Sequence, residues 1–161
     1  MQRIAVYAGS FDPITTGHMD LVRRATQLFD RVILSIGQNP KKQYLLSVEA
    51  RRSVLEACVA DLDTVSVDVF EGLLIDHCRK VGAGFILRGL RAVSDFEFEF
   101  QIGLANMDMA PQVETVFLLT EPRNIFVSSS LVKEIAQNGG DVSRYVPEPA
   151  FGPLMASVQG R

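Results

Sequence analysis

Residues 9–18, GSFDPITTGH, join an apolar run to an amphipathic helical pattern, and this stretch decides the predicted fold. The residues before it, Arg-Ile-Ala-Val-Tyr-Ala at positions 3–8, have the length and β-branched content of a buried strand. In residues 18–29, apolar side chains recur at helical spacing, namely Leu21, Val22, Ala25, Leu28 and Phe29. Residues 9–18 are therefore predicted to form the turn between a strand and a helix.

This turn has the features of an anion-binding loop. Gly9 and Gly17 allow close backbone approach, and Pro13 bends the chain. A helix that begins at Gly17 or His18 would point its free N–H groups and the positive end of its dipole toward the loop. His18 extends the inward stripe of that helix to its first turn, so its side chain should overhang the ends of the strands.

Strands and helices alternate along the rest of the chain. Further strands are predicted at residues 31–37, 65–70, 85–87 and 116–119. Helices are predicted after an N-cap at Ser47, over residues 74–81 and 94–109, and from about Ser129 to Asn138. Gly82 or Gly84 should end the helix at 74–81.

This alternation predicts an α/β fold with right-handed crossovers and a parallel sheet covered on both faces. We expect one domain over residues 1–161, with a Rossmann-like, doubly wound sheet of five strands in the order 3-2-1-4-5. Ligands of such sheets bind beyond the carboxyl ends of the strands, at the switch point, which falls between the first and fourth strands. The loops there carry Ser10, His18, Arg88 and Arg91, and the loop after the fifth strand carries a serine run.

The segment 94–109 is predicted to be a helix, although residues 95–100 alternate as a strand would. Two apolar stripes run along it, one of Phe96, Phe100, Leu104 and Met107, the other of Phe98, Ile102, Ala105 and Met109. One stripe can face the sheet. The other should pack against a neighbouring subunit.

Composition argues against several classes of protein. The 161 residues are 47% hydrophobic, but no apolar run approaches the length of about 20 that a membrane helix needs. The start of the chain does not resemble a leader, so we expect a cytoplasmic protein without a membrane partner. A net charge of −3 without long Lys/Arg blocks argues against polymeric nucleic acid. Cys58 and Cys78 lie on apolar helix faces and are expected in the core.

The basic and hydroxyl residues allow both structural and functional interpretations. Lys41 and Lys42, after the second strand, could be solvated loop lysines. Arg88 follows a predicted buried strand and precedes Gly89, which places its charge at the switch point. The run 127–133, VSSSLVK, could act only as a helix N-cap, but its hydroxyls and free N–H groups also suit a triphosphate.

Two of these motifs resemble the signatures of the nucleotidyltransferase superfamily. Residues 9–18 resemble Gly-(Ser/Thr)-Phe-Asp-Pro followed by (His/Thr)-x-Gly-His, and residues 127–133 resemble Ile-Ser-Ser-(Ser/Thr)-x-x-(Arg/Lys), with Val127 replacing isoleucine. Threonine at the first position of the second element narrows the resemblance to the phosphopantetheine adenylyltransferase family. Together with residues 88–99, the motifs follow that family's order and spacing across essentially the whole chain.

The resemblance implies transfer of adenylate from ATP to 4′-phosphopantetheine, giving dephospho-coenzyme A and pyrophosphate in the penultimate step of coenzyme A synthesis. It implies Mg²⁺, whose ligands stay open, and a homohexamer, which fits the doubly apolar helix. By the same resemblance, phosphopantetheine would contact Ser10, Lys42, Leu74 and Arg88. ATP would contact Ser10, Phe11, His18, Gly89, Leu90, Arg91, Glu99, Asn124, Ile125, Phe126, Val127, Ser128, Ser129 and Ser130.

The chain departs from the family pattern at two of these positions. Ser10 stands where threonine is common, which keeps the hydroxyl but gives a less rigid contact. Asn124 stands where many relatives carry an aromatic residue, so stacking on adenine is not expected there. What contacts adenine instead stays open.

The expected chemistry suits residues that act through charge and hydrogen bonds. The acceptor phosphate is already a nucleophile at neutral pH, so the site must bring two polyanions together and stabilise charge at the α-phosphorus. His18 is the expected transition-state stabiliser, with Lys42, Arg88 and Arg91 as cations and no serine-histidine-carboxylate triad; Lys42 and Arg91 are expected in catalytic roles. The helix dipole lowers the pKa of His18 and a triphosphate raises it, so the sequence leaves its charge state open.

Two alternatives stay open. A different nucleotidyltransferase could act on nicotinate mononucleotide or glycerol phosphate with the same loop, but it would give no reason for Lys42 and Arg88 to meet one terminal phosphate. A non-catalytic nucleotide sensor of flavodoxin-like topology could also use this loop. Release of pyrophosphate from ATP only when an acceptor is added would distinguish an enzyme from a sensor.

Overall fold

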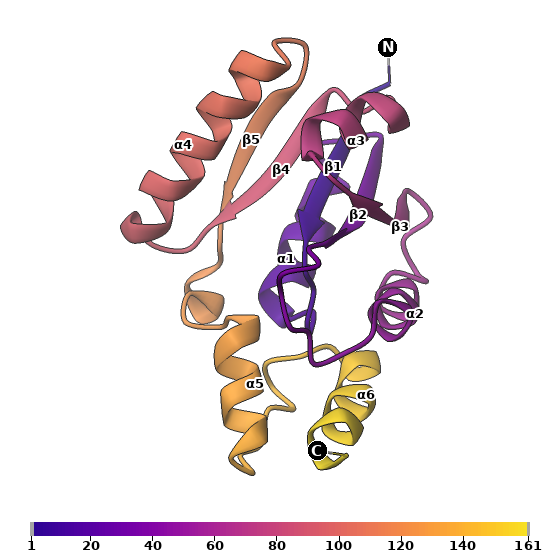
Figure 1. The fold of residues 1–161 in the computed structure, drawn as a ribbon, viewed down its shortest axis with the longest axis vertical. Coiled ribbons are helices and arrows are strands. Elements are labelled where there is room, and N and C mark those ends of the chain that lie inside the picture. Colours follow the sequence, from indigo (N-terminus) through magenta and orange to yellow (C-terminus); the bar gives the residue numbers. More distant parts are fainter. Residues whose placement is uncertain (1, 161) are drawn as a thin grey trace.

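A parallel five-stranded sheet forms the centre of the computed structural model, which describes residues 2–160 (Figure 1). The strands are β1 (Ile4–Gly9), β2 (Arg31–Gln38), β3 (Val65–Glu71), β4 (Phe85–Leu90) and β5 (Glu114–Leu119). Their order is β3-β2-β1-β4-β5, and each neighbouring pair is parallel. The predicted α/β class and strand order are confirmed.

Helices cover both faces of the sheet. They are α1 (Thr16–Ala25), α2 (Val48–Cys58), α3 (Leu74–Val81), α4 (Val93–Met109), α5 (Ser129–Gln137) and α6 (Glu148–Gln159), with a short 3₁₀ turn at Pro122–Asn124. Successive residues of a strand point to opposite faces. Accordingly, Tyr7 of β1 packs in one hydrophobic cluster with Leu21 of α1 and Leu55 of α2, and Val6 packs in a second cluster with Ile75 of α3.

The local sequence signals act where they were predicted. Ser47 caps α2 by accepting a hydrogen bond from the Ala50 N–H at 3.1 Å. Gly82 ends α3 with φ of 70°, a conformation that glycine adopts without a Cβ clash. Cys58 and Cys78 are buried free thiols, as expected for core residues.

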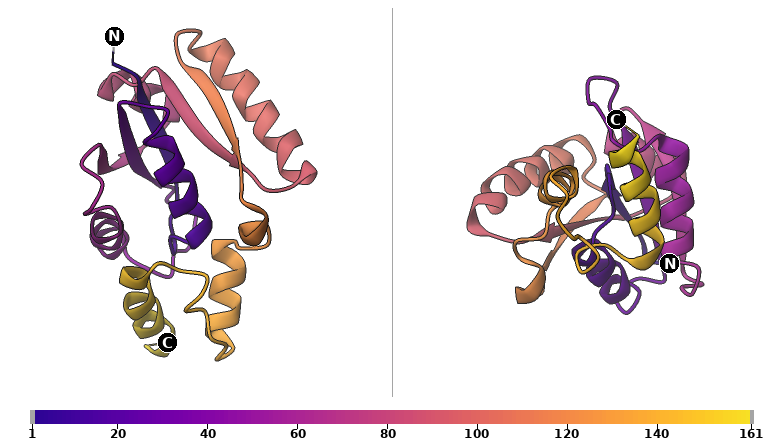
Figure 2. Two further views of the ribbon diagram at one scale, coloured as in Figure 1. Left: turned by 180° about the vertical axis from the view of Figure 1, so that it is seen from behind. Right: turned by 90° about the horizontal axis from the view of Figure 1, so that it is seen from below.

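Helices α5 and α6 lie beyond the carboxyl ends of the strands (Figures 1 and 2). Helix α6 was not predicted, because Gly152 and Pro153 interrupt its pattern. Its side chain Leu154 is nevertheless fully buried in the same cluster as Leu55 of α2. No helix within residues 2–160 is long and apolar enough to cross a membrane.

Helix α4 confirms the predicted element but not the predicted orientation of its stripes. Both stripes are largely solvent-exposed, with Phe98 reaching 64% exposure. The buried positions are Gly103 and Asn106. A Cβ at Gly103 would lie 3.5 Å from the ring of Phe117 in β5, so the missing side chain lets the helix pack closely on the sheet. The prediction that one stripe faces the sheet is therefore wrong.

Candidate active site

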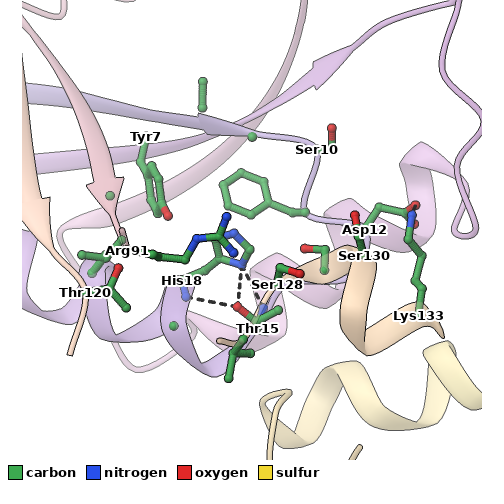
Figure 3. Close-up of a pocket in the computed structure, with 18 of the residues that line it drawn as sticks. Tyr7, Ser10, Asp12, Thr15, His18, Arg91, Thr120, Ser128, Ser130 and Lys133 are labelled. Atoms are coloured by element: carbon green, nitrogen blue, oxygen red, sulfur yellow. Dashed lines mark hydrogen bonds and ion pairs between the residues drawn. The ribbon is translucent and has the colours of Figure 1, made fainter. Parts of the chain in front are cut away.

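A cavity of about 510 Å³ opens at the carboxyl ends of β1 and β4, which is the predicted switch point. Five segments line it: the end of β1 with the loop to α1 and the first turns of that helix, residues 42–44, the end of β4 with Arg91, the loop after β5 with Thr120, Asn124 and Val127, and the start of α5. Figure 3 shows 18 of the lining residues. Segments from both ends of the chain thus meet around one space. The strand β4 continues to Leu90, so Arg88 and Gly89 belong to the strand rather than to the loop after it.

Aromatic packing fixes the first half of the loop. Phe11 has φ of 47° and is buried, and its ring meets those of Tyr7 and His18 edge-on at centroid distances of 5.6 and 5.3 Å. A Cβ at Gly9 would approach the Phe11 ring to 3.1 Å, so glycine leaves room for this ring. The peptide bond between Asp12 and Pro13 is cis.

A reciprocal cap fixes His18 at the start of α1. The Thr15 N–H donates to Nδ1 of His18 at 3.0 Å, and the His18 N–H donates to Oγ1 of Thr15 at 3.4 Å. A backbone N–H can only donate, so Nδ1 is the unprotonated nitrogen. The proton of the neutral ring is therefore on Nε2, and His18 lines the cavity.

In the free protein, the surroundings of His18 favour the neutral form of the charge state that the sequence left open. Burial, followed by the charges of Arg91 and Arg88, lowers the pKa of His18 to about 4. The imidazole is therefore neutral at pH 7. Two of the N–H groups at the start of α1 are engaged, because that of Thr16 donates to the Tyr145 carbonyl at 2.9 Å and that of His18 is occupied by the cap. Within residues 2–160 the Gly17 N–H has no hydrogen-bond partner, so the predicted anion-binding donors are reduced to that one.

Asp12 joins three segments of the wall. Its buried carboxylate accepts hydrogen bonds from the N–H groups of Leu45 and Leu46, at 2.9 and 2.8 Å. The ammonium group of Lys133 lies 3.0 Å from Oδ2. Both motifs found in the sequence, residues 9–18 and 127–133, are thus tied to each other by one ion pair.

The three hydroxyls of the serine run, Ser128 to Ser130, have different contacts. Ser128 caps α5 by accepting from the Leu131 N–H at 3.1 Å, and Ser129 donates to the Pro13 carbonyl at 2.8 Å. The Ser130 hydroxyl has no hydrogen-bond partner within residues 2–160 and lines the cavity. All three residues are in the wall, but Ser129 donates its hydroxyl proton to Pro13, so the O–H groups of Ser128 and Ser130 are the ones left to donate to a ligand.

Arg88 lies at the cavity with most of its charge already engaged. Its Nε and Nη2 donate to Glu99 of α4 at 2.6 and 2.5 Å, and its Nη1 donates to the Ala8 carbonyl at 3.2 Å. Burial lowers the pKa of Arg88, and the Glu99 carboxylate raises it by more, so the guanidinium stays charged. Two of its five N–H bonds remain for a ligand.

Two further cations differ in their partners. Arg91 lines the cavity and pairs with Asp95 at 3.2 Å. Lys42 also lines the cavity, and within residues 2–160 its ammonium group has no carboxylate partner. Lys42 is therefore the cation that an incoming anion meets without competition.

Some predicted site residues are not in the cavity wall. The wall contains Ser10, Phe11, His18, Lys42, Arg88, Gly89, Arg91, Asn124, Val127, Ser128, Ser129 and Ser130. It does not contain Leu74, Leu90, Glu99, Ile125 or Phe126. Glu99 stands behind Arg88, and Ile125 and Phe126 are exposed. A second hollow of about 380 Å³ shares Ser10, Lys42 and Arg88 and continues to Gly72, two residues before Leu74.

Asn124 has a structural contact in this wall. Its side chain is buried, and its Oδ1 accepts from the Thr16 hydroxyl at 3.2 Å. The amide thus holds the start of α1 against the turn that precedes α5. An aromatic ring at this position would remove that hydrogen bond.

Sequence reasoning missed several wall residues, namely Tyr7, Asp12, Thr15, Gly17, Leu21, Gln43, Tyr44, Thr120 and Lys133. Asp12, Thr15, Gly17 and Lys133 were within the quoted motifs but received no site role. Tyr7 alternates with Val6 on a strand that leads into the loop, which was an available signal. Tyr44 and Thr120 follow strands through irregular loops, whose paths no periodicity predicts.

No metal centre is built from protein side chains in the described part of the chain, where no group of three or more His, Cys, Asp or Glu residues is placed to hold an ion. The carboxylates nearest the cavity are already paired, Asp12 with Lys133, Glu99 with Arg88, and Asp95 with Arg91. A carboxylate without a cationic partner, the kind of ligand that Mg²⁺ prefers, is thus not found among these residues.

The fold and the cavity define a nucleotidyltransferase-like α/β domain, and residues 6–135 match the family model described as cytidylyltransferase-like. The structure is similar to that of a bifunctional NMN adenylyltransferase/ADP ribose pyrophosphatase from Francisella tularensis, with a TM-score of 0.69 and 20% identity. That match covers 91% of this chain and 45% of the other and supports the fold.

Curated relatives identify the family. The phosphopantetheine adenylyltransferase of Caldanaerobacter subterraneus subsp. tengcongensis is 49% identical over 153 residues, which cover 95% of this chain and 96% of that protein. The phosphopantetheine adenylyltransferase of Heliobacterium modesticaldum is 52% identical over 157 residues, covering 98% and 93%. The chain belongs to the phosphopantetheine adenylyltransferase family.

Proposed function

We propose that this chain transfers the adenylyl group of ATP to the phosphate of 4′-phosphopantetheine, giving dephospho-coenzyme A and pyrophosphate. The observation that carries the proposal is the convergence on one cavity of both sequence motifs, which supply His18 and Lys133, with Lys42, Arg88 and Arg91. Family membership directs the choice of acceptor. A nucleoside triphosphate and a second phosphate group are negatively charged ligands, which suit the cations of this wall.

The two substrates would occupy different ends of the cavity. Lys42 and Arg88 are shared with the second hollow, which leads to Gly72 and the start of α3. This end suits the acceptor, whose phosphate would meet Lys42 and the free N–H bonds of Arg88. The start of α5, with Ser130 and Lys133, and the side that carries Arg91 suit the triphosphate.

The reaction is one displacement at phosphorus. An oxygen of the acceptor phosphate forms a bond to the α-phosphorus of ATP, and the bond from that phosphorus to the bridging oxygen of the β-phosphate breaks. Pyrophosphate leaves with the electron pair. The dianionic acceptor needs no general base, so the protein contributes position and charge stabilisation.

His18 would act as a neutral donor in this step. Its Nδ1 is held by the Thr15 N–H, so the proton on Nε2 is available for a non-bridging oxygen of the α-phosphate. Only a bond that strengthens as charge shifts toward the transition state accelerates the reaction. The cap that orients the ring therefore also sets the tautomer that the reaction needs.

Mg²⁺ is proposed as part of the nucleotide substrate rather than as a resident ion. The ion pairs of Asp12, Glu99 and Asp95 leave no free carboxylate for it among the residues near the cavity. Triphosphate oxygens and water are the ligands that remain for a hard cation.

The assembly and the location are also proposals. The exposed stripes of α4 support a closed oligomer, a homohexamer by analogy with the family, since Phe96, Phe98 and Phe100 lie on the outside of one chain. A cytoplasmic location suits the free thiols of Cys58 and Cys78.

An acceptor screen tests the proposed reaction. The purified protein is incubated with ATP and Mg²⁺, and pyrophosphate release is measured with 4′-phosphopantetheine, nicotinate mononucleotide, glycerol 3-phosphate or no acceptor. Release that requires 4′-phosphopantetheine is expected. Release with another acceptor alone would identify a different transferase, and no release with any acceptor would support a nucleotide sensor.

A further inference from the structure

Arg51 of α2 is a buried cation that the proposed reaction does not use. Its side chain is 2% exposed, yet within residues 2–160 it forms no ion pair with a carboxylate. Its Nη1 donates to the Ser10 carbonyl at 2.9 Å, and its guanidinium carbon lies 4.0 Å from the centre of the Tyr44 ring. Its Nε is buried and has no hydrogen-bond partner in the same part of the chain.

Burial of this charge is unfavourable for folding alone. A guanidinium out of water is usually compensated by a carboxylate and by hydrogen bonds to all its N–H groups. Arg51 has a ring face and a carbonyl instead, and one N–H is unsatisfied. An apolar residue of similar length would fill the same space without this cost, so stability does not explain the arginine.

The contacts of Arg51 lie in two loops that both form the cavity wall. Ser10 comes from the loop after β1, and Tyr44 comes from the loop after β2 that also carries Lys42. Arg51 itself does not line the cavity. Arg51 would therefore act on a ligand through the loops that it holds and through its charge, and not by direct contact.

The hydrogen bond to Ser10 sets the direction of the next backbone donor. The C=O and N–H of a trans peptide point in opposite directions. Because the Ser10 carbonyl points to Arg51, the Phe11 N–H points away from α2. That N–H has no partner within residues 2–160, and Phe11 lines the cavity with the unusual φ of 47°.

We infer that Arg51 is a positioning residue that holds the Ser10–Phe11 peptide so that the Phe11 N–H donates to a nucleotide phosphate. It acts from behind the wall, and its charge adds a positive potential at the same point. This inference deepens the proposed function and rests on it, since the phosphate is that of the nucleotide.

The test compares Arg51→Met and Arg51→Lys with Arg52→Met. Arg52 is the neighbouring, exposed arginine on the same helix, paired with Glu56, and serves as the matched control. Three quantities are measured for each protein: melting temperature, kcat with ATP and acceptor, and calorimetric affinity for inorganic pyrophosphate without acceptor.

Arg51→Met should melt at or above the wild-type temperature, while kcat and pyrophosphate affinity each fall about tenfold, the effect of one lost charge-assisted contact. Arg51→Lys, which keeps a charged donor for the Ser10 carbonyl, should recover part of both. Arg52→Met should match the wild type. Because pyrophosphate binding needs no acceptor, this result is separate from the identity of the acceptor.

Three outcomes would overturn the inference. One is an Arg51→Met protein whose kcat and pyrophosphate affinity stay within twofold of the wild type. Another is a loss of folded protein in both Arg51 variants, which would make the arginine a folding residue. The last is an equal loss in Arg52→Met. A wild type without any transfer activity would instead contradict the proposed function.

Discussion

The loop at residues 9–18 and helix α4 differ in how far their apolar side chains are exposed. In the loop, Phe11 and Ile14 are 3% and 0% exposed, and the polar groups of Asp12 and Thr15 are hydrogen-bonded. On α4, Phe98 is 64% exposed. The loop thus buries its apolar side chains within one chain, whereas α4 leaves its own exposed, the surface on which the proposed assembly rests.

An ion pair between Arg88 of β4 and Glu99 links α4 to the cavity wall that the loop also forms. Arg88 faces the cavity and Glu99 belongs to α4, so the helix that faces outward also holds a cation of the site. Catalytic geometry should therefore depend most on the loop, less on the ion pair, and least on the outer face of α4. Four experiments test this order.

The largest expected effect belongs to His18→Ala. Loss of the Nε2 donor should lower kcat by a factor on the order of 10²–10³, as removal of one oxyanion-hole donor does, with a much smaller change in ATP affinity. Steady-state kinetics and melting temperature are measured together. His18→Asn keeps an N–H donor and should retain more activity. Near-normal turnover of a well-folded His18→Ala protein would show that His18 only caps the helix and has no catalytic role.

Arg88→Ala should come next. Loss of its contact with the acceptor phosphate should cost about 1.5–3 kcal/mol, seen as a higher acceptor KM and a lower kcat. The variant also leaves the partly buried Glu99 without its partner. The double variant Arg88→Met/Glu99→Gln removes both charges and separates this penalty from substrate binding. Unchanged acceptor kinetics in Arg88→Ala would exclude Arg88 from the site.

A smaller effect is expected from pH. The pKa of His18 is lowered from its ordinary value of 6.5 to about 4 in the folded protein, so between these values the unfolded chain binds more protons. Stability should therefore rise with pH through this window, and His18→Ala should show a weaker rise. NMR titration of the two histidines gives the pKa directly. A pKa near 6.5 for His18 would contradict its burial beside Arg91.

The smallest effect on turnover, but a large effect on assembly, is expected from Phe98→Glu. Charge on the exposed stripe should prevent association, so sedimentation should show a smaller species, while kcat per chain stays within a few-fold of the wild type. Glu97→Gln, on the same helix, serves as the control. A wild type that is strictly monomeric at micromolar concentration would refute the assembly proposal.

The sequence predicted the sheet well because strand periodicity and turn residues are local. The caps at Ser47 and Gly82 follow from short stretches of residues. The strand order was expected from the alternation of strands and helices along the chain. The orientation of the α4 stripes was predicted wrongly, because an apolar side chain indicates burial but does not indicate which surface buries it. Helix α6 was not predicted, because Pro153 and Gly152 are unfavourable inside a helix. Packing against distant parts of the chain stabilises this helix nevertheless.

The site was predictable only in part. His18, Lys42 and Arg88 follow strands or motifs, so connectivity placed them together. Leu74 and Phe126 were expected from resemblance and are not in the wall. Arg51 left a signal that was not used, since it lies four residues before Leu55 and thus extends the inward stripe of α2. Its contact with Ser10 depends on tertiary packing, which the stripe alone does not define.

The ion pair between Asp12 and Lys133 has a consequence for folding during translation. The two residues are 121 positions apart. The hydrogen bond from the Thr16 N–H to the Tyr145 carbonyl likewise joins residues far apart in the sequence. A ribosome makes the loop first and its partners last. The carboxylate of Asp12 therefore emerges without its cation, and a growing chain cannot close this site until most of its length has been translated. Ligand binding during synthesis would begin only then.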